Sequence, residues 1–417
     1  MERQDTYSTG KDRYSGNTCR GVRKDRHAGW QMSGCGERQN SMKDGKFLTL
    51  GIESSCDETA VSVVADGRTM LSNTISSQIA IHTLYGGVVP EIASRHHLEN
   101  INSVIGESLK TAGVTLDDID LIGVTNGPGL IGAVVIGVAT AKALAFAKDI
   151  PLVGVNHMHG HVSANYIQYP DLEPPFISLV VSGGHTQIIK VTDYNRCEMI
   201  GSTRDDAAGE AFDKVARVIG LGYPGGPKVD KAARGGDPEA VDFKRVWLEK
   251  GSYDFSFSGL KTQALNYINK ERMQGHEIPV ADIAASYQAA IMDVIIKKSI
   301  RAALEFSREA GKKESSLAVS ATPGTIEAVV PGAKAVSDEA PSRRRAPNLV
   351  VAGGVAANSA LREDLAKAAA EHGIDLYIPD PVLCTDNGAM IGAAAYYKYK
   401  AEGPDSLDLD AFADLEM

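Results

Sequence analysis

Cysteine is scarce in this chain, and its placement excludes two kinds of architecture. Only 5 of the 417 residues are Cys, and they lie far apart, at Cys19, Cys35, Cys56, Cys197 and Cys384. An odd number of widely spaced cysteines argues against a disulfide scaffold and against a zinc site made of Cys ligands. The same usage fits a reducing compartment, so we expect a cytoplasmic protein.

Long apolar runs and positive charge are lacking as well. No run of membrane-spanning length is free of glycine and charge, and no signal-peptide core opens the chain, so no membrane association is expected. The formal net charge is −10, which gives no global attraction to nucleic acid. Any contact with RNA would therefore need a local basic patch or a partner protein.

The length, the hydrophobic content and the order of strand and helix patterns predict an α/β protein. With 43% hydrophobic residues and 42 glycines, 417 residues can form two or more domains with cores of their own. Strand patterns alternate with helical patterns along most of the chain.

The stretch Val155–Asn165, V-N-H-M-H-G-H-V-S-A-N, contains the main candidate for a functional site. It follows an apolar run, Pro151–Val155, that predicts a buried strand, and Asn156 is a suitable N-cap for a helix. In such a helix His157 and His161 share one face. Two imidazoles placed in this way can bind one metal ion and leave its other side open. A bare H-x-x-x-H also fits histidines that only line a loop.

A strand–turn–strand pattern occurs twice. Phe47–Ala65 carries Glu53, Ser54, Ser55, Asp57 and Thr59 in or beside its turn, which suits a phosphate, a hydrated cation or an ordinary solvated hairpin. Phe176–Val191 repeats the pattern with a Ser182-Gly183-Gly184 turn, where a substrate can approach the backbone closely. The repeat predicts a duplicated α/β domain with a cleft between two halves.

Other elements are read from periodicity and turn residues. Helices are expected at Ala93–Lys110, Ile131–Lys148, Asp205–Gly220, Ala281–Phe306 and Gly388–Lys400, and strands at Leu121–Thr125, Pro347–Ala352 and Tyr377–Pro379.

Within Asp205–Gly220 the i,i+4 pairs Glu210–Lys214 and Asp213–Arg217 are expected to form a salt-bridged, solvated face. The segments Gly222–Asp230, Ser256–Thr262 and Pro381–Asn387 are expected to be loops, the first a shaped binding loop. Asn358, after a Gly-Gly turn, suits either a nucleoside contact or a helix N-cap.

These patterns give a domain scheme. Residues 1–46 are expected to be a disordered extension, 47–172 one domain, 173–387 a second domain with a disordered insertion at 314–345, and 402–417 a tail.

Seven segments in order resemble one known family. They are N-H-M-H-G-H, V-S-G-G-H-T-Q, D-D-A-A-G-E-A-F-D-K, G-Y-P-G-G-P, F-S-F-S-G-L-K-T, G-G-V-A-A-N and C-T-D-N-G-A-M-I-G. Together they resemble the TsaD (Gcp or YgjD) family of tRNA N6-adenosine threonylcarbamoyltransferases over Phe47 to about Lys400. The resemblance implies an actin-like, sugar-kinase-like (ASKHA) fold of two RNase H-like domains around a cleft, the first completed by the helix at 388–401.

The resemblance also implies a site. A single divalent metal ion would be held by His157, His161 and Asp386. Two imidazoles and a carboxylate suit Fe(II), which we expect, and Zn(II) is the alternative. Residues that correspond to the family's adenylate contacts are Val180, Val181, Ser182, Gly183, Gly184, Asp213, Gly226, Asp230 and Asn358. Asp213 and Asp230 would accept hydrogen bonds from ribose hydroxyls.

The reaction implied is acyl transfer. The N6 amine of adenosine 37, in tRNAs that read codons starting with A, attacks the carbamoyl carbon of threonylcarbamoyl-AMP, and AMP leaves. The implied partners are tRNA, a TsaB-like paralogue and a TsaE-like ATPase, with Mg-ATP entering through a partner protein. We expect replacement of His157 or His161 to abolish this reaction.

Three other functions fit parts of the sequence. A metalloprotease of the H-E-x-x-H type is disfavoured because Met158 stands where its general-base Glu is needed. An actin-like kinase or ATPase would use the same cleft but leaves the two histidines unexplained. A non-catalytic scaffold would have no need of the histidine pair.

Overall fold

The structure is a computed structural model that describes residues 45–320 and 347–417, with the backbone alone for residues 310–320. The predicted extension, up to residue 44, and the predicted insertion, from residue 321 to 345, lie outside the described residues. Residues 314–320 of the predicted insertion belong instead to helix α8 (Val280–Ser320). The predicted end of this helix near Phe306 is therefore wrong.

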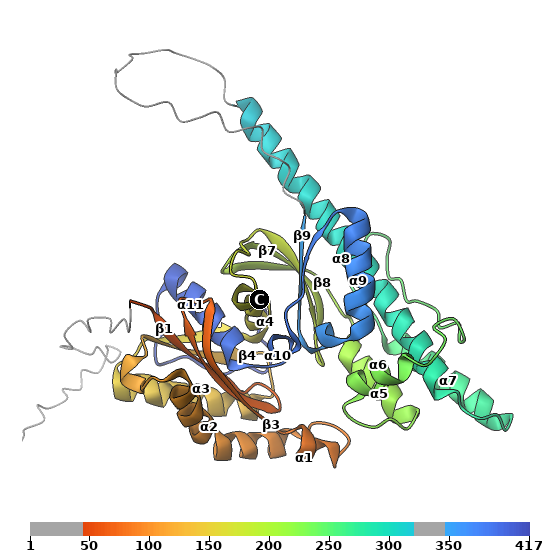
Figure 1. Ribbon diagram of the computed structural model, residues 1–417, viewed down its shortest axis with the longest axis horizontal. Coiled ribbons are helices and arrows are strands. Elements are labelled where there is room, and N and C mark those ends of the chain that lie inside the picture. The colour runs from red at the N-terminus through yellow and green to blue at the C-terminus, as the bar shows by residue number, and fades with distance from the viewer. Residues whose placement is uncertain (1–44, 321–346) are drawn as a thin grey trace, which may run out of the picture. The chain divides into compact units, whose positions relative to one another are not determined.

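The first sheet contains the predicted N-terminal hairpin and has the strand order β3-β2-β1-β4-β5 (Figure 1). Its strands are β1 (Leu48–Glu53), β2 (Glu58–Ala65), β3 (Thr69–Ser77), β4 (Leu121–Gly127) and β5 (Leu152–Asn156). Strands β1 and β2 pair antiparallel with Leu48 opposite Ala65, whereas β4 pairs parallel with β1 and with β5. Because every residue of β1 and β4 is buried, both strands are mostly apolar and lack the alternation of a strand with one solvated face.

The second sheet repeats this arrangement in the order β10-β9-β6-β7-β8. Its strands are β6 (Phe176–Val181), β7 (Thr186–Asp193), β8 (Arg196–Ser202), β9 (Asn348–Ala352) and β10 (Asp375–Tyr377). The hairpin β6–β7 pairs Phe176 with Val191, and β9 pairs parallel with β6 and β10. Each half thus has a three-stranded antiparallel unit extended by two parallel strands, as the repeated hairpins predict.

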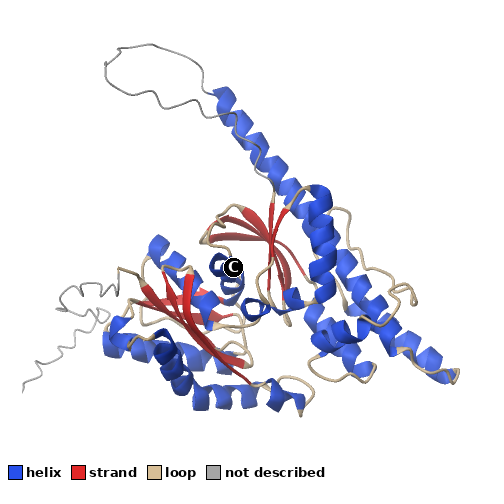
Figure 2. Ribbon diagram, viewed as in Figure 1, coloured by secondary structure: helices blue, strands red, loops and turns tan. Residues whose placement is uncertain are grey.

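Helices pack on both sheets (Figure 2). In chain order they are α1 (Ile79–Thr83), α2 (Pro90–Ala112), α3 (Ile131–Lys148), α4 (His157–Gln168), α5 (Ala208–Val218), α6 (Gly225–Ala233), α7 (Ser258–Met273), α8, α9 (Ser359–His372), α10 (Pro381–Cys384) and α11 (Gly388–Glu402). Two short 3₁₀ segments are Leu116–Asp118 and Gly354–Ala357. The order of strands and helices gives an α/β protein.

Three predicted loops are partly helical, among them Pro381–Asn387, whose first four residues form α10 (Pro381–Cys384). Helix α6 begins at Gly225 and takes up most of the predicted loop Gly222–Asp230, and α7 begins at Ser258 inside the predicted loop Ser256–Thr262. Glycine and proline favour loops, but they are also tolerated in the first turn of a helix, where the N–H groups have no partner within the helix.

Helix α3 is the one helix in the described part of the chain that is long and apolar enough to cross a membrane. Its residues Ala133, Val134, Val138 and Ala141 are buried, and it packs against β4 and α2. Helices in the core of a folded domain have the same composition.

Helix α11 returns from the second half to pack against β1, β2 and β4 of the first sheet, and it also packs along α4. Glycine residues where α11 meets β1 and α4 allow these elements to pack closely. A Cβ on Gly51 would lie 2.2 Å from the carbonyl oxygen of Gly388, and one on Gly160 of α4 would lie 2.7 Å from Cδ1 of Ile391. Residues after α11 continue along the first sheet, where the Asp405 N–H donates to the Leu152 carbonyl at 2.8 Å.

We expect Gly51→Ala to lower the free energy of unfolding by about 3 kcal/mol, because the new methyl group meets backbone atoms that no rotamer change can move. Gly106→Ala is the matched control, since its Cβ meets nothing within 4 Å and alanine favours the α2 helix. Urea denaturation of both variants measures the difference. Equal stability of Gly51→Ala and the parent chain would contradict the close packing of α11 on β1.

Candidate metal and substrate site

The two histidines lie where the sequence places them, in the first turns of α4. The helix begins directly after β5, and the Asn156 side chain accepts a hydrogen bond from the Met158 N–H at 2.9 Å, as an N-cap does. His157 and His161 share a face, with ring centroids 4.6 Å apart. Met158 points away from that face into an apolar cluster.

Asp386 joins the histidines from far along the chain. It lies between α10 and α11, next to Asn387, whose side chain caps α11 by accepting from the Met390 N–H. Its Oδ1 is 3.5 Å from Nε2 of His157 and 3.3 Å from Nε2 of His161. One donor atom from each of the three side chains lies within 4.8 Å of the others, so the group could hold a metal ion.

Glu53, which the sequence placed at the first hairpin turn without a link to the histidines, completes the surroundings of His157. It is fully buried at the end of β1, and its Oε2 lies 3.0 Å from Nδ1 of His157 and 2.6 Å from the hydroxyl of Thr125, which donates to it. A carboxylate on one ring nitrogen holds the proton there and leaves the other nitrogen free as an acceptor. Glu53 therefore directs Nε2 of His157 towards Asp386.

The charges at this site favour a cation. Burial alone would lower the pKa of His157, but the carboxylates of Glu53 and Asp386 outweigh burial and raise that pKa to about 9. Burial would raise the pKa of Asp386, but His157 and His161 lower it to about 2. Burial would raise the pKa of Glu53 as well, but His157 lowers it. Both carboxylates are therefore ionised, and they stabilise positive charge at Nε2 of His157, whether a proton or a metal ion that replaces it.

The hydrogen bonding of His161 fits a metal ligand. Both of its ring nitrogens are buried and neither makes a hydrogen bond of regular geometry among the described residues, although Nε2 lies 3.3 Å from the Asp386 carboxylate. Buried polar atoms without partners are costly in a folded protein. Coordination of a divalent metal by Nε2, together with Nε2 of His157 and the Asp386 carboxylate, would remove that cost for Nε2.

His157 and Asp386 line a cavity of about 900 Å³ that is bounded by both halves of the chain. Both hairpin turns reach it, through Ser55–Glu58 from the first half and Ser182–His185 from the second. Of the residues expected at the adenylate, those that line the cavity are Ser182, Gly183, Gly184, Asp213, Gly226, Asp230 and Asn358. Val180 and Val181 do not line it, because their side chains are buried in the apolar clusters on the two faces of β6.

Glycine leaves much of the cavity open. A Cβ on Gly183, Gly184, Gly226 or Gly354 would meet no atom within 4 Å. A ligand can therefore come close to the backbone at the β6–β7 turn and at the first turn of α6.

The polar residues of the cavity are held in place by other contacts. Asp213 accepts from the Gly225 N–H at 2.6 Å, and burial raises its pKa. Asp230 accepts from the Ser359 hydroxyl at 2.7 Å and pairs with Arg234. Each carboxylate keeps acceptor positions for a ligand hydroxyl.

Asn358 has the capping role that the sequence left as one of two alternatives. Its Oδ1 accepts from the Leu361 N–H, and its Nδ2 donates to Gln288 at 2.7 Å. It also lines the cavity, so one amide hydrogen is left to contact a ligand.

Two further titratable residues at the cavity were missed. Burial and the neighbouring histidines lower the pKa of His185 to about 4, so it is neutral at pH 7. Burial and the carboxylates of Asp386 and Asp57 raise the pKa of Glu58 to about 9, so it holds a proton at pH 7. The only signal in the sequence was their position in the two hairpin turns.

Comparison with known proteins identifies close relatives. The model of the TsaD family, tRNA N6-adenosine threonylcarbamoyltransferase, matches residues 69–393. The chain is 49% identical over 372 residues to the enzyme of this name from Clostridium perfringens, covering 89% of this chain and 98% of the relative. It is 50% identical over 368 residues to the enzyme from Clostridium botulinum, covering 88% and 97%.

Solved structures of lower identity share the fold. Full-length HypF in its phosphate- and nucleotide-bound form aligns with a TM-score of 0.51 at 15% identity, covering 86% of this chain and 56% of HypF. HypF from T. kodakarensis gives the same TM-score at 14% identity, covering 86% and 48%. The predicted actin-like fold is confirmed.

Proposed function

Because the chain belongs to the TsaD family of tRNA N6-adenosine threonylcarbamoyltransferases, we propose that its cleft transfers threonylcarbamoyl from threonylcarbamoyl-AMP to N6 of adenosine 37 in tRNA. The observation that supports this site for the reaction is the convergence of His157, His161 and Asp386, since His157 and Asp386 also line a cavity large enough for a nucleotide.

Within the cavity we assign the adenylate to the second half of the chain. Asp213 and Asp230 have acceptor positions for the ribose hydroxyls, and the open faces of Gly183 and Gly184 leave room for the acyl phosphate. The adenine would lie near Asn358 at the first turn of α9. This arrangement directs the threonylcarbamoyl group towards the two histidines.

The ion that suits the three ligands is Fe(II), with Zn(II) as the alternative, and when bound it supplies Lewis acidity towards the acyl carbonyl. The chain's own residues prepare the site for it. Glu53 holds the Nδ1 proton of His157, and the helical spacing of α4 holds both rings on one face. The N6 amine is a weak nucleophile, so orientation of donor and acceptor in a shared cavity lowers the barrier to its attack.

The reaction requires a route for tRNA and a supply of the adenylate. A chain with a net charge of −10 attracts RNA poorly, which supports assistance from partner proteins. We propose a TsaB-like paralogue and a TsaE-like ATPase in this role, with Mg-ATP bound by the latter, in the cytoplasm.

Reconstitution tests this function. Unmodified tRNA, threonine, bicarbonate, ATP, the adenylate-forming enzyme and the partner proteins are combined with and without this chain, and the nucleosides are analysed by mass spectrometry. We expect threonylcarbamoyladenosine only when the chain is present. The Clostridium perfringens relative in place of this chain is the control, and product with the relative but none with this chain would contradict the assignment.

A metalloprotease is not supported by the site. The residue beside His157 is Met158, which is buried in an apolar cluster. The nearest carboxylate, Glu53, contacts Nδ1 of His157 and is fully buried, so it cannot reach a water in the cavity as a general base must.

A further inference from the structure

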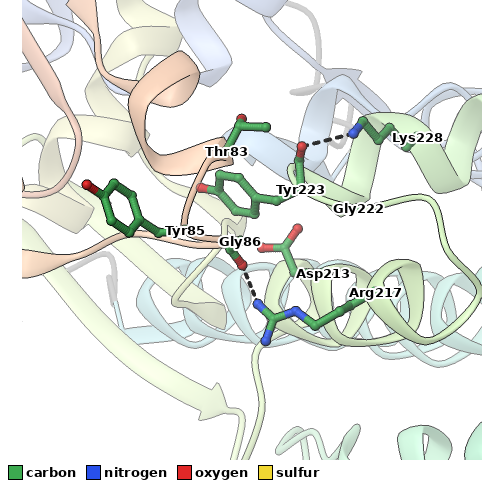
Figure 3. A pocket seen from close by; sticks show the side chains of 8 residues that line it. All are labelled: Thr83, Tyr85, Gly86, Asp213, Arg217, Gly222, Tyr223 and Lys228. Carbon is green, nitrogen blue, oxygen red and sulfur yellow. Dashed lines mark hydrogen bonds between the residues drawn. The ribbon is translucent and has the colours of Figure 1, made fainter.

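A second, smaller cavity of about 370 Å³ adjoins the main one (Figure 3). The two cavities share Gly86, Asp213, Arg217 and Tyr223 in their walls. The segment after α1 forms one wall and helices α5 and α6 with their connection form the other. A ligand in the main cavity can therefore extend into the smaller one.

Two cations of this smaller cavity differ from the other cations around the cleft. Arg217 and Lys228 each line it, and no carboxylate of the described residues lies within ion-pair distance of either. By contrast, Lys214 pairs with Asp206 and Glu210. Arg234 pairs with Asp230. The predicted ion pair of Asp213 with Arg217 is not formed, and the guanidinium turns to the Gly86 carbonyl instead.

Both cations keep donors for a ligand. Arg217 donates one N–H to the Gly86 carbonyl, and Lys228 donates to the Tyr223 carbonyl at 2.9 Å, as Figure 3 shows. A guanidinium has five N–H donors and an ammonium has three, so most remain available. Asp213 is the one acid in this cavity wall, and its carboxylate is engaged by the Gly225 N–H. Two positive charges against one negative charge favour an anion.

Two tyrosines line the same cavity as the cations. Tyr223 is half-buried, whereas Tyr85 is 60% exposed and its ring points away from Arg217 and Lys228 (Figure 3). Unpaired cations together with an exposed aromatic ring on one surface are the combination that binds single-stranded nucleic acid, with phosphates on the cations and bases stacked on the rings. An exposed ring also indicates a ligand that continues out of the cleft.

We propose that this cavity binds a phosphodiester of the tRNA next to the target adenosine, with Arg217 and Lys228 contacting the phosphate and Tyr85 stacking on a neighbouring base. The proposal rests on the proposed function. A phosphate could also come from the adenylate, but that molecule has no further nucleotide to reach the exposed Tyr85. The unpaired cations thus supply, locally, the positive charge that the chain lacks overall.

The test uses charge-removing variants that keep a donor for each carbonyl. Arg217→Gln, Lys228→Gln and the double variant are assayed in the reconstituted transfer reaction, with separate titrations of tRNA and of threonylcarbamoyl-AMP at several salt concentrations. Lys231→Gln is the matched control, because Lys231 is an exposed cation on the same helix that lines neither cavity.

We expect the double variant to raise KM for tRNA by about tenfold or more and to flatten its dependence on salt by about 0.7 per lost contact in a log–log plot. The KM for threonylcarbamoyl-AMP and the Lys231→Gln enzyme should be unchanged. An unchanged KM for tRNA, or a rise confined to threonylcarbamoyl-AMP, would overturn the proposal. Failure of the parent chain to modify tRNA would instead reject the proposed function.

Discussion

The His161→Ala variant is expected to lose threonylcarbamoyl transfer by about 10³-fold or more while it keeps its fold. A Lewis acid held by three ligands contributes several kcal/mol to an acyl transfer, and 1.4 kcal/mol corresponds to a factor of ten in rate. The fold should persist because neither ring nitrogen of His161 makes a regular hydrogen bond among the described residues, and the 3.3 Å contact of Nε2 is with Asp386, another residue of the site. Rates of product formation and thermal unfolding of the same preparation measure the two effects.

His159→Ala is the matched control for that variant. His159 lies in the same helix between the two proposed ligands, is half-buried, and is not part of the three-residue group. We expect its transfer rate to stay within about threefold of the parent rate, as for a change outside the reacting groups. Equal losses in His159→Ala and His161→Ala would show that the helix tolerates no change, and a fully active His161→Ala enzyme would contradict the metal site.

The Glu53→Gln variant is expected to weaken metal binding by about 10- to 100-fold, the usual effect of losing a carboxylate behind a histidine ligand. The amide has the same shape but removes the negative charge that raises the pKa of His157 and fixes its Nδ1 proton. Competition with a chelator measures the metal dissociation constant, and activity should return at high metal concentration. Unchanged metal affinity in Glu53→Gln would show that this carboxylate does not orient His157.

The sequence predicted the elements whose signals are local. Both hairpins follow from apolar strands on either side of a short polar turn, and the start of α4 follows from Asn156 as its N-cap. The sequence failed where glycine and proline lie at the start of a helix, as at Gly225 in α6. It also failed at the end of α8, because the small and polar residues after Phe306 suit a helix as well as a loop.

The contacts that the sequence did not predict join segments that lie far apart along the chain. The resemblance to a family brought Asp386 into the site, since nothing near it in the chain indicates a metal. The contact of Glu53 with His157 was not predicted, because His157 belongs to another strand–helix unit of the same half, far along the chain. Arg217 was expected to pair with Asp213 one turn away, but the carbonyl of Gly86 from the other half lies within its reach.

The metal content of the purified chain tests the central claim most directly. We predict one Fe(II) or Zn(II) ion per parent chain by elemental analysis, and an anomalous diffraction peak between Nε2 of His157, Nε2 of His161 and the carboxylate of Asp386. The His161→Ala chain, loaded in parallel, should hold far less metal. A parent chain that carries out the transfer with no bound metal, or that binds its ion elsewhere, would contradict the account.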